Sequence, residues 1–143
     1  MNLRLPPRIK VLEALGALAD GRVRVLAPGR CEVVSSEGDK IYTVYVAGGY
    51  AYSNDNGTVH RGYVGYPILA CLMAGGALPV DRELAERLRG IPWKRLNEQF
   101  KKYEEVMRFI YAERGIDRAR AESYIASVLG EVEKLRLKFK TPP

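Results

Sequence analysis

The sequence predicts an α+β protein: an N-terminal antiparallel β-meander of four or five strands packed on helices, followed by a C-terminal helical hairpin or coiled-coil-like region. Three observations lead to this fold class. Residues 22–64 form short runs of alternating polarity, separated by Gly, Asn and Asp, which is typical of hairpins. Apolar residues before and after this stretch recur at helical intervals. Beyond Gly90 these intervals become those of heptads, typical of helices that pack on helices.

The first predicted element is an amphipathic helix over residues 7–20. Ile9, Leu12 and Leu15 recur at helical spacing. A proline pair precedes them, and Gly21 follows them. Proline at the start and glycine after the end are typical of helix boundaries.

Strands are expected next, because the period of the apolar pattern changes to two. Val23, Val25, Val44 and Val46 can form the buried side of a sheet. The turns contain Pro28-Gly29, Gly48-Gly49 and the run Asn54 to Gly57. The predicted strands cover residues 22–26, 31–36, 41–47, 50–53 and 58–64.

Two further helical segments complete the N-terminal unit. Pro67 opens an apolar helix that we expect to pack on the back of the sheet. Asp81 is an N-cap candidate for a polar helical turn that ends at Gly90. We therefore predict an α+β domain over residues 1–90 and a helical oligomerisation region over residues 91–143.

Two apolar seams run through the C-terminal region at heptad spacing, and Asp117 is the expected N-cap of the second helix. A two-helix hairpin cannot bury such seams unaided. They predict a homo-oligomer, either a dimer or a tetramer. The seam residues are Leu96, Phe100, Tyr103, Met107 and Ile110 in the first helix, and Ala121, Ile125, Val128, Val132, Leu135 and Phe139 in the second.

Several classes of protein find no support in the sequence. His60 is the only histidine and has no neighbouring cysteine or histidine at zinc-site spacing, so no metal site is predicted. Neither Cys31 nor Cys71 has a histidine partner for nucleophilic catalysis, and we expect no enzyme and no cofactor. The two cysteines can be buried thiols or one disulfide. We expect a cytoplasmic protein without a membrane span, because no long apolar run and no secretory signal are present.

The tyrosines are concentrated in the predicted sheet. Six of the nine fall between residues 42 and 66, with arginines and a lysine around them. Tyrosine rings stack on unpaired bases and arginines pair with phosphate, so this combination is typical of surfaces that bind single-stranded nucleic acid. Strand propensity is the other explanation, since tyrosine is a favoured strand residue. The candidate binding residues are Arg22, Arg24, Arg30, Lys40, Tyr45, Tyr50, Tyr52, Arg61, Tyr63 and Tyr66.

Overall charge agrees with an anionic partner. The chain carries 23 Lys and Arg against 17 Asp and Glu, a net charge of +6. Basic proteins attract nucleic acid without sequence preference. The highly charged surface of a thermophilic protein can have a similar ratio of basic to acidic residues, so the charge alone is a weak indication. Glutamine and asparagine are scarce, which fits a protein from a hot environment.

Two family resemblances follow from these features. Residues 22–74 resemble a SWIM domain in the order of hairpin, strand and apolar helix, but Tyr50-Ala51-Tyr52 and Gly65-Tyr66-Pro67 stand where its zinc ligands are expected. The resemblance therefore implies a topology and no zinc. The whole chain resembles the archaeal ThermoDBP family of single-stranded DNA-binding proteins, through its length, the Tyr- and Arg-rich helix and meander over 8–64, and the heptad seams. That resemblance implies a small α/β nucleic-acid-binding domain with a C-terminal helical assembly region.

We therefore expect sequence-tolerant binding of single-stranded nucleic acid, with single-stranded DNA as the expected partner and RNA left open. Stacking and phosphate pairing serve both polymers. The alternative is a protein-interaction module in which the tyrosines fill strands or face a protein partner.

Overall fold

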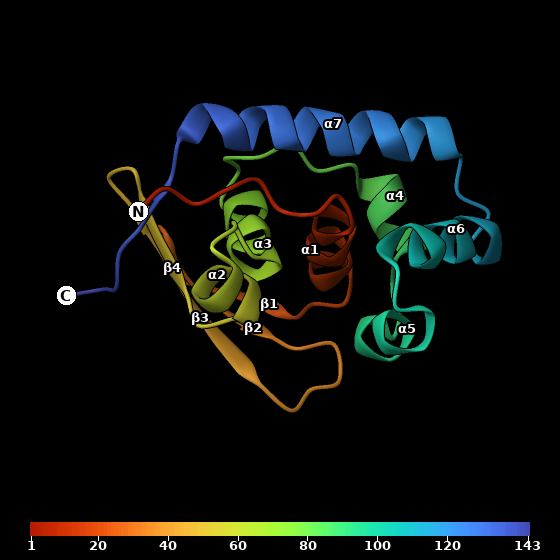
Figure 1. The fold of residues 1–143 in the computed structure, drawn as a ribbon, viewed down its shortest axis with the longest axis horizontal. Helices are drawn as coiled ribbons and strands as arrows, with labels where there is room; N and C mark the ends of the chain where they lie inside the picture. Colours follow the sequence, from red (N-terminus) through yellow and green to blue (C-terminus); the bar gives the residue numbers. More distant parts are fainter.

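A five-stranded sheet carries all of its helices on one side (Figure 1). The computed structural model describes residues 1–143. The strand order is β1-β2-β3-β4-β5. The chain runs through α1 (Ile9–Ala19), β1 (Val23–Ala27), β2 (Arg30–Val34), β3 (Ile41–Ala47), β4 (Tyr50–Ser53), α2 (Asn56–Arg61), α3 (Tyr66–Ala74), α4 (Arg82–Arg87), α5 (Trp93–Phe100), α6 (Tyr103–Glu113), α7 (Arg118–Leu135) and β5 (Lys138–Phe139).

The four-stranded antiparallel meander is confirmed. Strands β1 to β4 pair in chain order, and each pair is antiparallel. Cys31, Val33, Val44 and Ala51 are buried on the side toward the helices. Val25 was predicted to be buried with them but is 51% exposed, because β1 lies at the edge of the sheet.

The predicted fifth strand over residues 58–64 is wrong. Residues Asn56–Arg61 form the short helix α2 instead. The Asp55 carboxylate accepts hydrogen bonds from the Thr58 amide and from Thr58 Oγ1, so it caps the helix N-terminus. Gly62 ends the helix in the left-handed conformation. The fifth strand is β5, which pairs in parallel with β4 from the far end of the chain.

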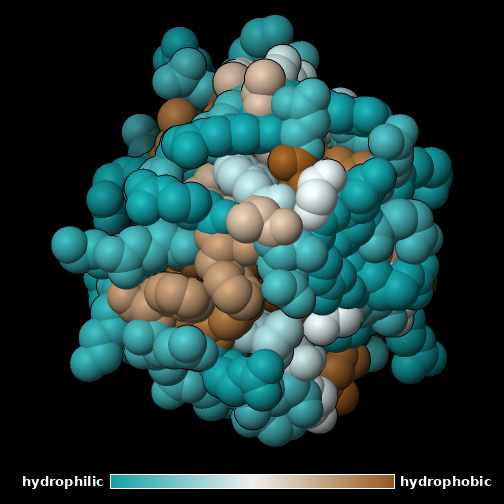
Figure 2. Space-filling model, turned by 90° about the vertical axis from the view of Figure 1, so that its right-hand side faces the viewer, coloured by the Kyte–Doolittle hydropathy of each residue, from teal (hydrophilic) through white to brown (hydrophobic).

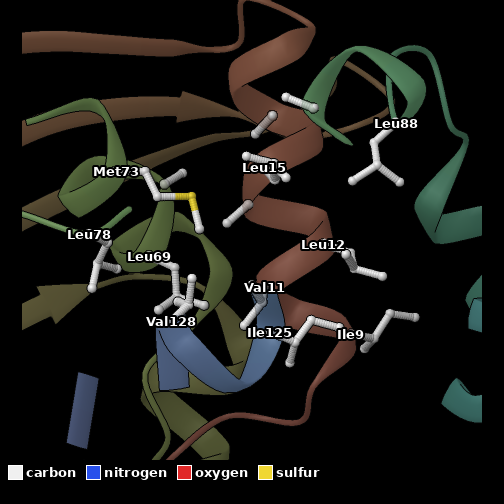
Figure 3. Packing of buried hydrophobic residues seen from close by; sticks show 14 of the residues in the cluster. Ile9, Val11, Leu12, Leu15, Leu69, Met73, Leu78, Leu88, Ile125 and Val128 are labelled. Atoms are coloured by element: carbon white, nitrogen blue, oxygen red, sulfur yellow. The ribbon is translucent and has the colours of Figure 1, made fainter. Parts of the chain in front are cut away.

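Helix α1 forms where it was predicted and lies in the middle of the helical layer. Its buried residues include Ile9, Leu12 and Leu15. Helix α3 packs against the sheet, α1 packs against α3, and α4, α6 and α7 pack against α1. Side chains of α3 and α7, including Leu69, Ile125 and Val128, meet those of α1 (Figure 3). Buried residues of the predicted N-terminal and C-terminal regions thus belong to one hydrophobic cluster.

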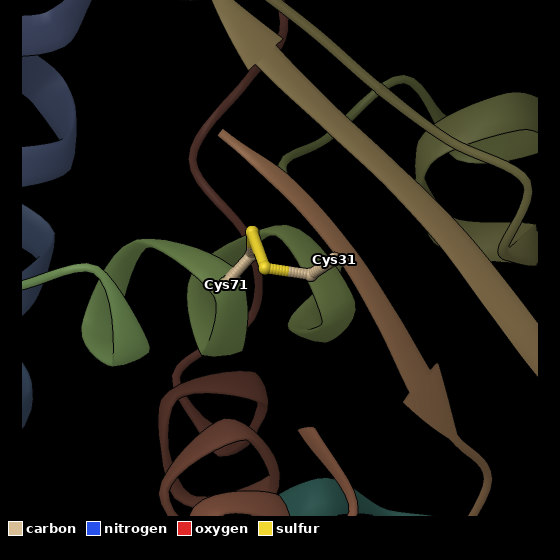
Figure 4. Close-up of a disulfide and its surroundings, with 2 residues drawn as sticks. All are labelled: Cys31 and Cys71. Carbon is tan, nitrogen blue, oxygen red and sulfur yellow. A yellow bond between two sulfur atoms is a disulfide. The ribbon is translucent and has the colours of Figure 1, made fainter. Parts of the chain in front are cut away.

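A disulfide links the sheet to the helical layer. Helix α3 begins beside Pro67, as predicted, and its Cys71 is bonded to Cys31 of β2 (Figure 4). Both cysteines are buried. The sequence was compatible with two buried thiols or with one disulfide, and the structure contains the disulfide.

The C-terminal region contains no clear helical hairpin or coiled coil, which corrects that part of the predicted fold. The expected first seam helix is divided into α5 and α6 at Lys101, which has a positive φ of 63°. Most seam residues are buried inside the protomer, whereas Tyr103 and Leu135 are 41% and 39% exposed. Phe139 belongs to β5 and not to a helical seam. The heptad pattern reflects packing on α1 and neighbouring helices of the same chain.

Removing the disulfide should destabilise the protein. Replacing both cysteines (Cys31→Ser with Cys71→Ser) should lower the free energy of unfolding by up to about 4 kcal/mol, because the bridge closes a loop of about 40 residues and restricts the unfolded chain. Urea unfolding followed by circular dichroism measures the loss. Reductant should lower the midpoint of the wild-type protein and leave that of the double variant unchanged. Equal midpoints for oxidised wild type and variant would show that the bridge adds no stability.

The two substitutions Ile125→Ala and Leu135→Ala should separate internal packing of α7 from packing between subunits. Ile125 is 1% exposed, so its truncation should cost about 2–5 kcal/mol. Leu135→Ala should cost about 0.5 kcal/mol, because that side chain lies at the surface. Thermal unfolding at several protein concentrations tests this. Equal losses for both variants, with a midpoint that rises with protein concentration, would place the seam between subunits.

Candidate nucleic-acid interface

One face of the sheet carries no helix. Helices α1, α2 and α3 all lie on the other side (Figure 1). The strand register aligns Arg30 of β2 with Tyr45 of β3, and Tyr45 with Tyr52 of β4. Residues opposite each other in a sheet point to the same side, so these three side chains form one row across the uncovered face. Tyr50 shares this side because it is two residues from Tyr52.

Cations lie directly over two of the rings. The Arg30 guanidinium is 4.9 Å from the centre of the Tyr45 ring, and Lys140 Nζ is 4.8 Å from the centre of the Tyr50 ring. The Tyr52 ring lies 5.7 Å from the Phe139 ring. Aromatic faces and cations are therefore interleaved. We call this surface the sheet face; it comprises Arg24, Arg30, Tyr45, Tyr50, Tyr52 and Lys140, with Phe139 of the edge strand β5 beside Tyr52.

The sheet face is mainly basic. Arg24 of β1 lies opposite Glu32 of β2, and the nitrogen-to-oxygen distance between their charged groups is 3.8 Å. The Arg24 side chain is 77% exposed. An exposed pair at this distance contributes little to stability, so Arg24 is available to another anion. Phe139 and Lys140 were not predicted for this surface. The alternating Lys-Phe-Lys at 138–140 is a strand-like signal, but the heptad pattern assigned Phe139 to a helix.

Arg22 lies elsewhere and has a structural role. Its Nη1 donates to the Val34 carbonyl oxygen at 2.7 Å, and its Nε donates to the Asp20 carboxylate at 3.1 Å. It also reaches the Tyr66 hydroxyl at 3.5 Å. Only 11% of the side chain is exposed. Arg22 therefore joins the end of α1 to the sheet instead of facing solvent beside Arg24.

The four other predicted residues line a concave groove on the helical side of the sheet. Lys40, Arg61, Tyr63 and Tyr66 contribute to it from the β2–β3 turn, α2 and the start of α3. The walls are completed by parts of α1 and α5, and the volume is about 510 Å³. Arg61 and Tyr63 thus do not extend the tyrosine row of the sheet, because their segment is not a strand. We call this concavity the tyrosine groove, after Tyr42, Tyr63, Tyr66 and Tyr103 in its lining.

A buried ion pair lies in the tyrosine groove. Lys10 Nζ is 3.0 Å from Glu13 Oε2, and Glu13 is only 4% exposed. Burial lowers the pKa of Lys10, but the charge and hydrogen bond of Glu13, together with smaller contributions from Tyr63 and Tyr103, outweigh burial and raise that pKa above its ordinary value. The Asn97 amide nitrogen donates to Glu13 at 3.4 Å, whereas the Asn97 carbonyl oxygen is buried without a hydrogen-bond partner. The groove therefore contains fixed charges and one unused acceptor.

The tyrosines of the groove are held by close packing. The Tyr42 and Tyr66 rings meet edge to face at 6.0 Å between centres. Burial raises the pKa of Tyr66 to about 12, although Arg22 opposes the shift. The Tyr63 ring lies against Gly57, where an added Cβ would approach Tyr63 Cε1 to 2.4 Å. Gly57 therefore makes room for this ring, a relation that sequence spacing alone does not reveal.

The structure has no group of three or more His, Cys, Asp or Glu side chains arranged to hold a metal ion. None of its helices combines the length and the apolar character that crossing a membrane requires.

The chain belongs to the family described as uncharacterised conserved protein UCP014422, whose model matches residues 3–138. No curated protein and no solved structure matches the chain significantly. The family match spans all the helices and strands β1 to β4, ends within β5, and brings no activity with it. The resemblance to the ThermoDBP family stays a prediction.

Proposed function

We propose that the protein binds single-stranded nucleic acid, without strong sequence preference, on the sheet face. The row formed by Arg30, Tyr45 and Tyr52 is the observation that carries the proposal. It places aromatic rings and a cation side by side on a surface that no helix covers. Unpaired bases stack on such rings, and the phosphates of the same strand pair with the neighbouring cations.

The spacing of the rings suits consecutive bases. Tyr45 and Tyr52 lie on neighbouring strands, which are about 4.8 Å apart, and Tyr50 lies about 7 Å from Tyr52 along β4. A base can also stack on the plane of the Arg30 guanidinium. Double-stranded nucleic acid hides its base faces, so single strands are the preferred form. Single-stranded DNA is the proposed partner, in line with the resemblance to the ThermoDBP family, and RNA is the alternative polymer.

A protein-interaction role is the second candidate, and an exposed apolar patch favours it. The side of the molecule that bears α5 and α6 is mostly hydrophilic, with one apolar patch near its middle and a few smaller apolar spots (Figure 2). On these helices Phe109 is 41% exposed, and its ring lies 5.3 Å from the ring of Phe100. Assembly of the chain into dimers or tetramers stays a prediction. The exposed patch is a better candidate for a contact between subunits than the seam residues, most of which are buried inside the protomer.

Tyrosine truncation on the sheet face should weaken binding of a single-stranded oligonucleotide. Tyr45→Ala and Tyr52→Ala should each reduce affinity by about 5- to 150-fold, because one stacked base contributes about 1–3 kcal/mol. Fluorescence anisotropy with labelled DNA and RNA oligonucleotides measures the change and compares the polymers. Phe109→Ala is the matched control, an exposed aromatic on α6 that should leave affinity unchanged. Equal affinity for all variants, each with wild-type circular dichroism, would remove the sheet face from the site.

Salt dependence should identify the phosphate contacts. The logarithm of affinity should fall with the logarithm of salt concentration, with a slope of about 0.7 per neutralised phosphate. Arg30→Ala and Lys140→Ala should each reduce this slope by about 0.7. Arg95→Ala, an exposed arginine on α5, should not change it. A slope near zero for the wild-type protein would refute the electrostatic part of the proposal.

A further inference from the structure

Two cations of the sheet face lie at opposite ends of its row of rings. Arg30 is at one end, on β2. Lys140 is at the other end, because its amide donates to the Ala51 carbonyl oxygen and continues the pairing of β5 with β4. Three strand spacings separate β2 from β5, a distance of about 14 Å. The row of rings is therefore bounded by positive charge on both sides.

Lys138 adds a second cation at the β5 end. It lies opposite Tyr50 in the parallel pairing of β4 with β5, and opposite residues of neighbouring strands point to the same side of a sheet. It is also two residues from Lys140, which shares that side. Arg30, Lys138 and Lys140 are exposed, and none of them forms a salt bridge. All three are therefore free to meet phosphate.

Glu32 is the one acidic side chain that the strands present on this face. It is two residues from Arg30 on β2 and opposite Arg24 on β1, at 3.8 Å from the Arg24 guanidinium. A phosphate beside Arg24 would meet the negative charge of Glu32 at short range, and that repulsion offsets the attraction of the arginine. The β1 side of the sheet face is therefore a poor place for the backbone of a nucleic acid.

A nucleic-acid strand can follow the tyrosines in two directions. Along β4 it passes Tyr50 and Tyr52, but the residues that continue this line are the uncharged Gly49 and Asn54. Across the sheet it passes Tyr45 and Tyr52 and meets a cation at each end. Stacked bases and phosphates alternate along the polymer, so only the direction across the sheet gives both of them a partner.

We propose that the sheet face binds a short single-stranded segment of about three or four nucleotides, which lies across the strands between Arg30 and the lysine pair Lys138 and Lys140. This placement rests on the function proposed above. One base stacks on Tyr45, one on Tyr52 and one on the plane of the Arg30 guanidinium, and the lysines hold the phosphate at the other end. The ligand is therefore a short unpaired stretch, such as a loop, a gap or a strand end, and a long strand is not required.

Binding of oligothymidylates of increasing length tests the footprint. Affinity should rise steeply up to about four nucleotides, and beyond that only in proportion to the number of registers that a longer strand offers. Isothermal titration calorimetry gives the affinity together with the stoichiometry, which separates extra registers on one protomer from a second protomer on the same strand. A steep rise that continues beyond about eight nucleotides per protomer would overturn the short footprint.

Two arginines of the same face provide a matched pair of variants. Arg30→Ala should weaken binding of a short oligothymidylate about tenfold or more, because a charge-assisted contact and a stacking plane are lost. Arg24→Ala should leave affinity within about twofold, although the Arg24 side chain is 77% exposed. Equal losses in the two variants, each with wild-type circular dichroism, would show that the strand extends over β1.

Glu32→Gln tests the boundary at β1. Removal of this charge should raise affinity, and Arg24→Ala should then become costly in the Glu32→Gln background, because Arg24 is free to hold a phosphate there. A lower affinity of Glu32→Gln would show that the carboxylate contacts the ligand, and would overturn the path across the sheet.

The lysine end is tested in the same way. Lys138→Ala should weaken binding about as much as Lys140→Ala. Lys134→Ala is the matched control, an exposed lysine of α7 that pairs with Glu131, and it should leave affinity unchanged. Equal affinity of Lys138→Ala and wild type would remove Lys138 from the site. Absence of binding at every length would refute the function of the sheet face itself, whereas binding with a longer footprint would refute the short segment alone.

Discussion

Burial of α1 is the constraint on which the rest of the structure depends. Its residues from Val11 to Ala17 are all buried, because α3 covers one side of the helix and α4, α6 and α7 cover others. Each large apolar side chain removed from water contributes about 1.5–3 kcal/mol, so most of the stabilising burial is gathered around this helix. The consequence for the sheet is one-sided packing. Since α3 covers one face and the helices assemble around α1 behind it, the opposite face remains free for tyrosines and arginines.

Sequence reasoning succeeded where a local pattern determines the geometry. The alternation of polarity put Tyr45, Tyr50 and Tyr52 on one side of the sheet, and the register agrees.

Sequence reasoning failed at residues 58–64, where an alternating pattern was overridden by the capping of α2 by Asp55. It also failed for Arg22, whose partners come from the end of α1 and from β2. Those contacts are set by tertiary structure and leave no periodic signal in the sequence. Phe139 and Lys140 were missed for the same reason, since β5 pairs with β4 only after the chain has passed through six helices.

The heptad seams show what periodicity can and cannot predict. Apolar residues every three or four positions require a buried stripe on a helix, and the buried Ile125, Val128 and Val132 satisfy that requirement. The spacing does not specify which surface covers the stripe. In this chain α1 lies against α7, so a stripe that resembles a subunit interface is largely covered within the protomer. Similarly, the clustered tyrosines predicted one binding surface and did not reveal that α2 would divide them between two places.

Strand β3 connects these two places. Its alternate side chains turn Tyr45 to the open face and Tyr42 toward the groove, so one strand contributes to both surfaces. The two surfaces differ in shape and in charge. An open sheet face accepts a continuous strand in any sequence, because stacking needs only the ring of each base. The groove is concave, and its lining holds five cations and five carboxylates, so it presents no excess of positive charge. Strand β3 therefore separates an open, aromatic and basic surface from a concave, electrically balanced one.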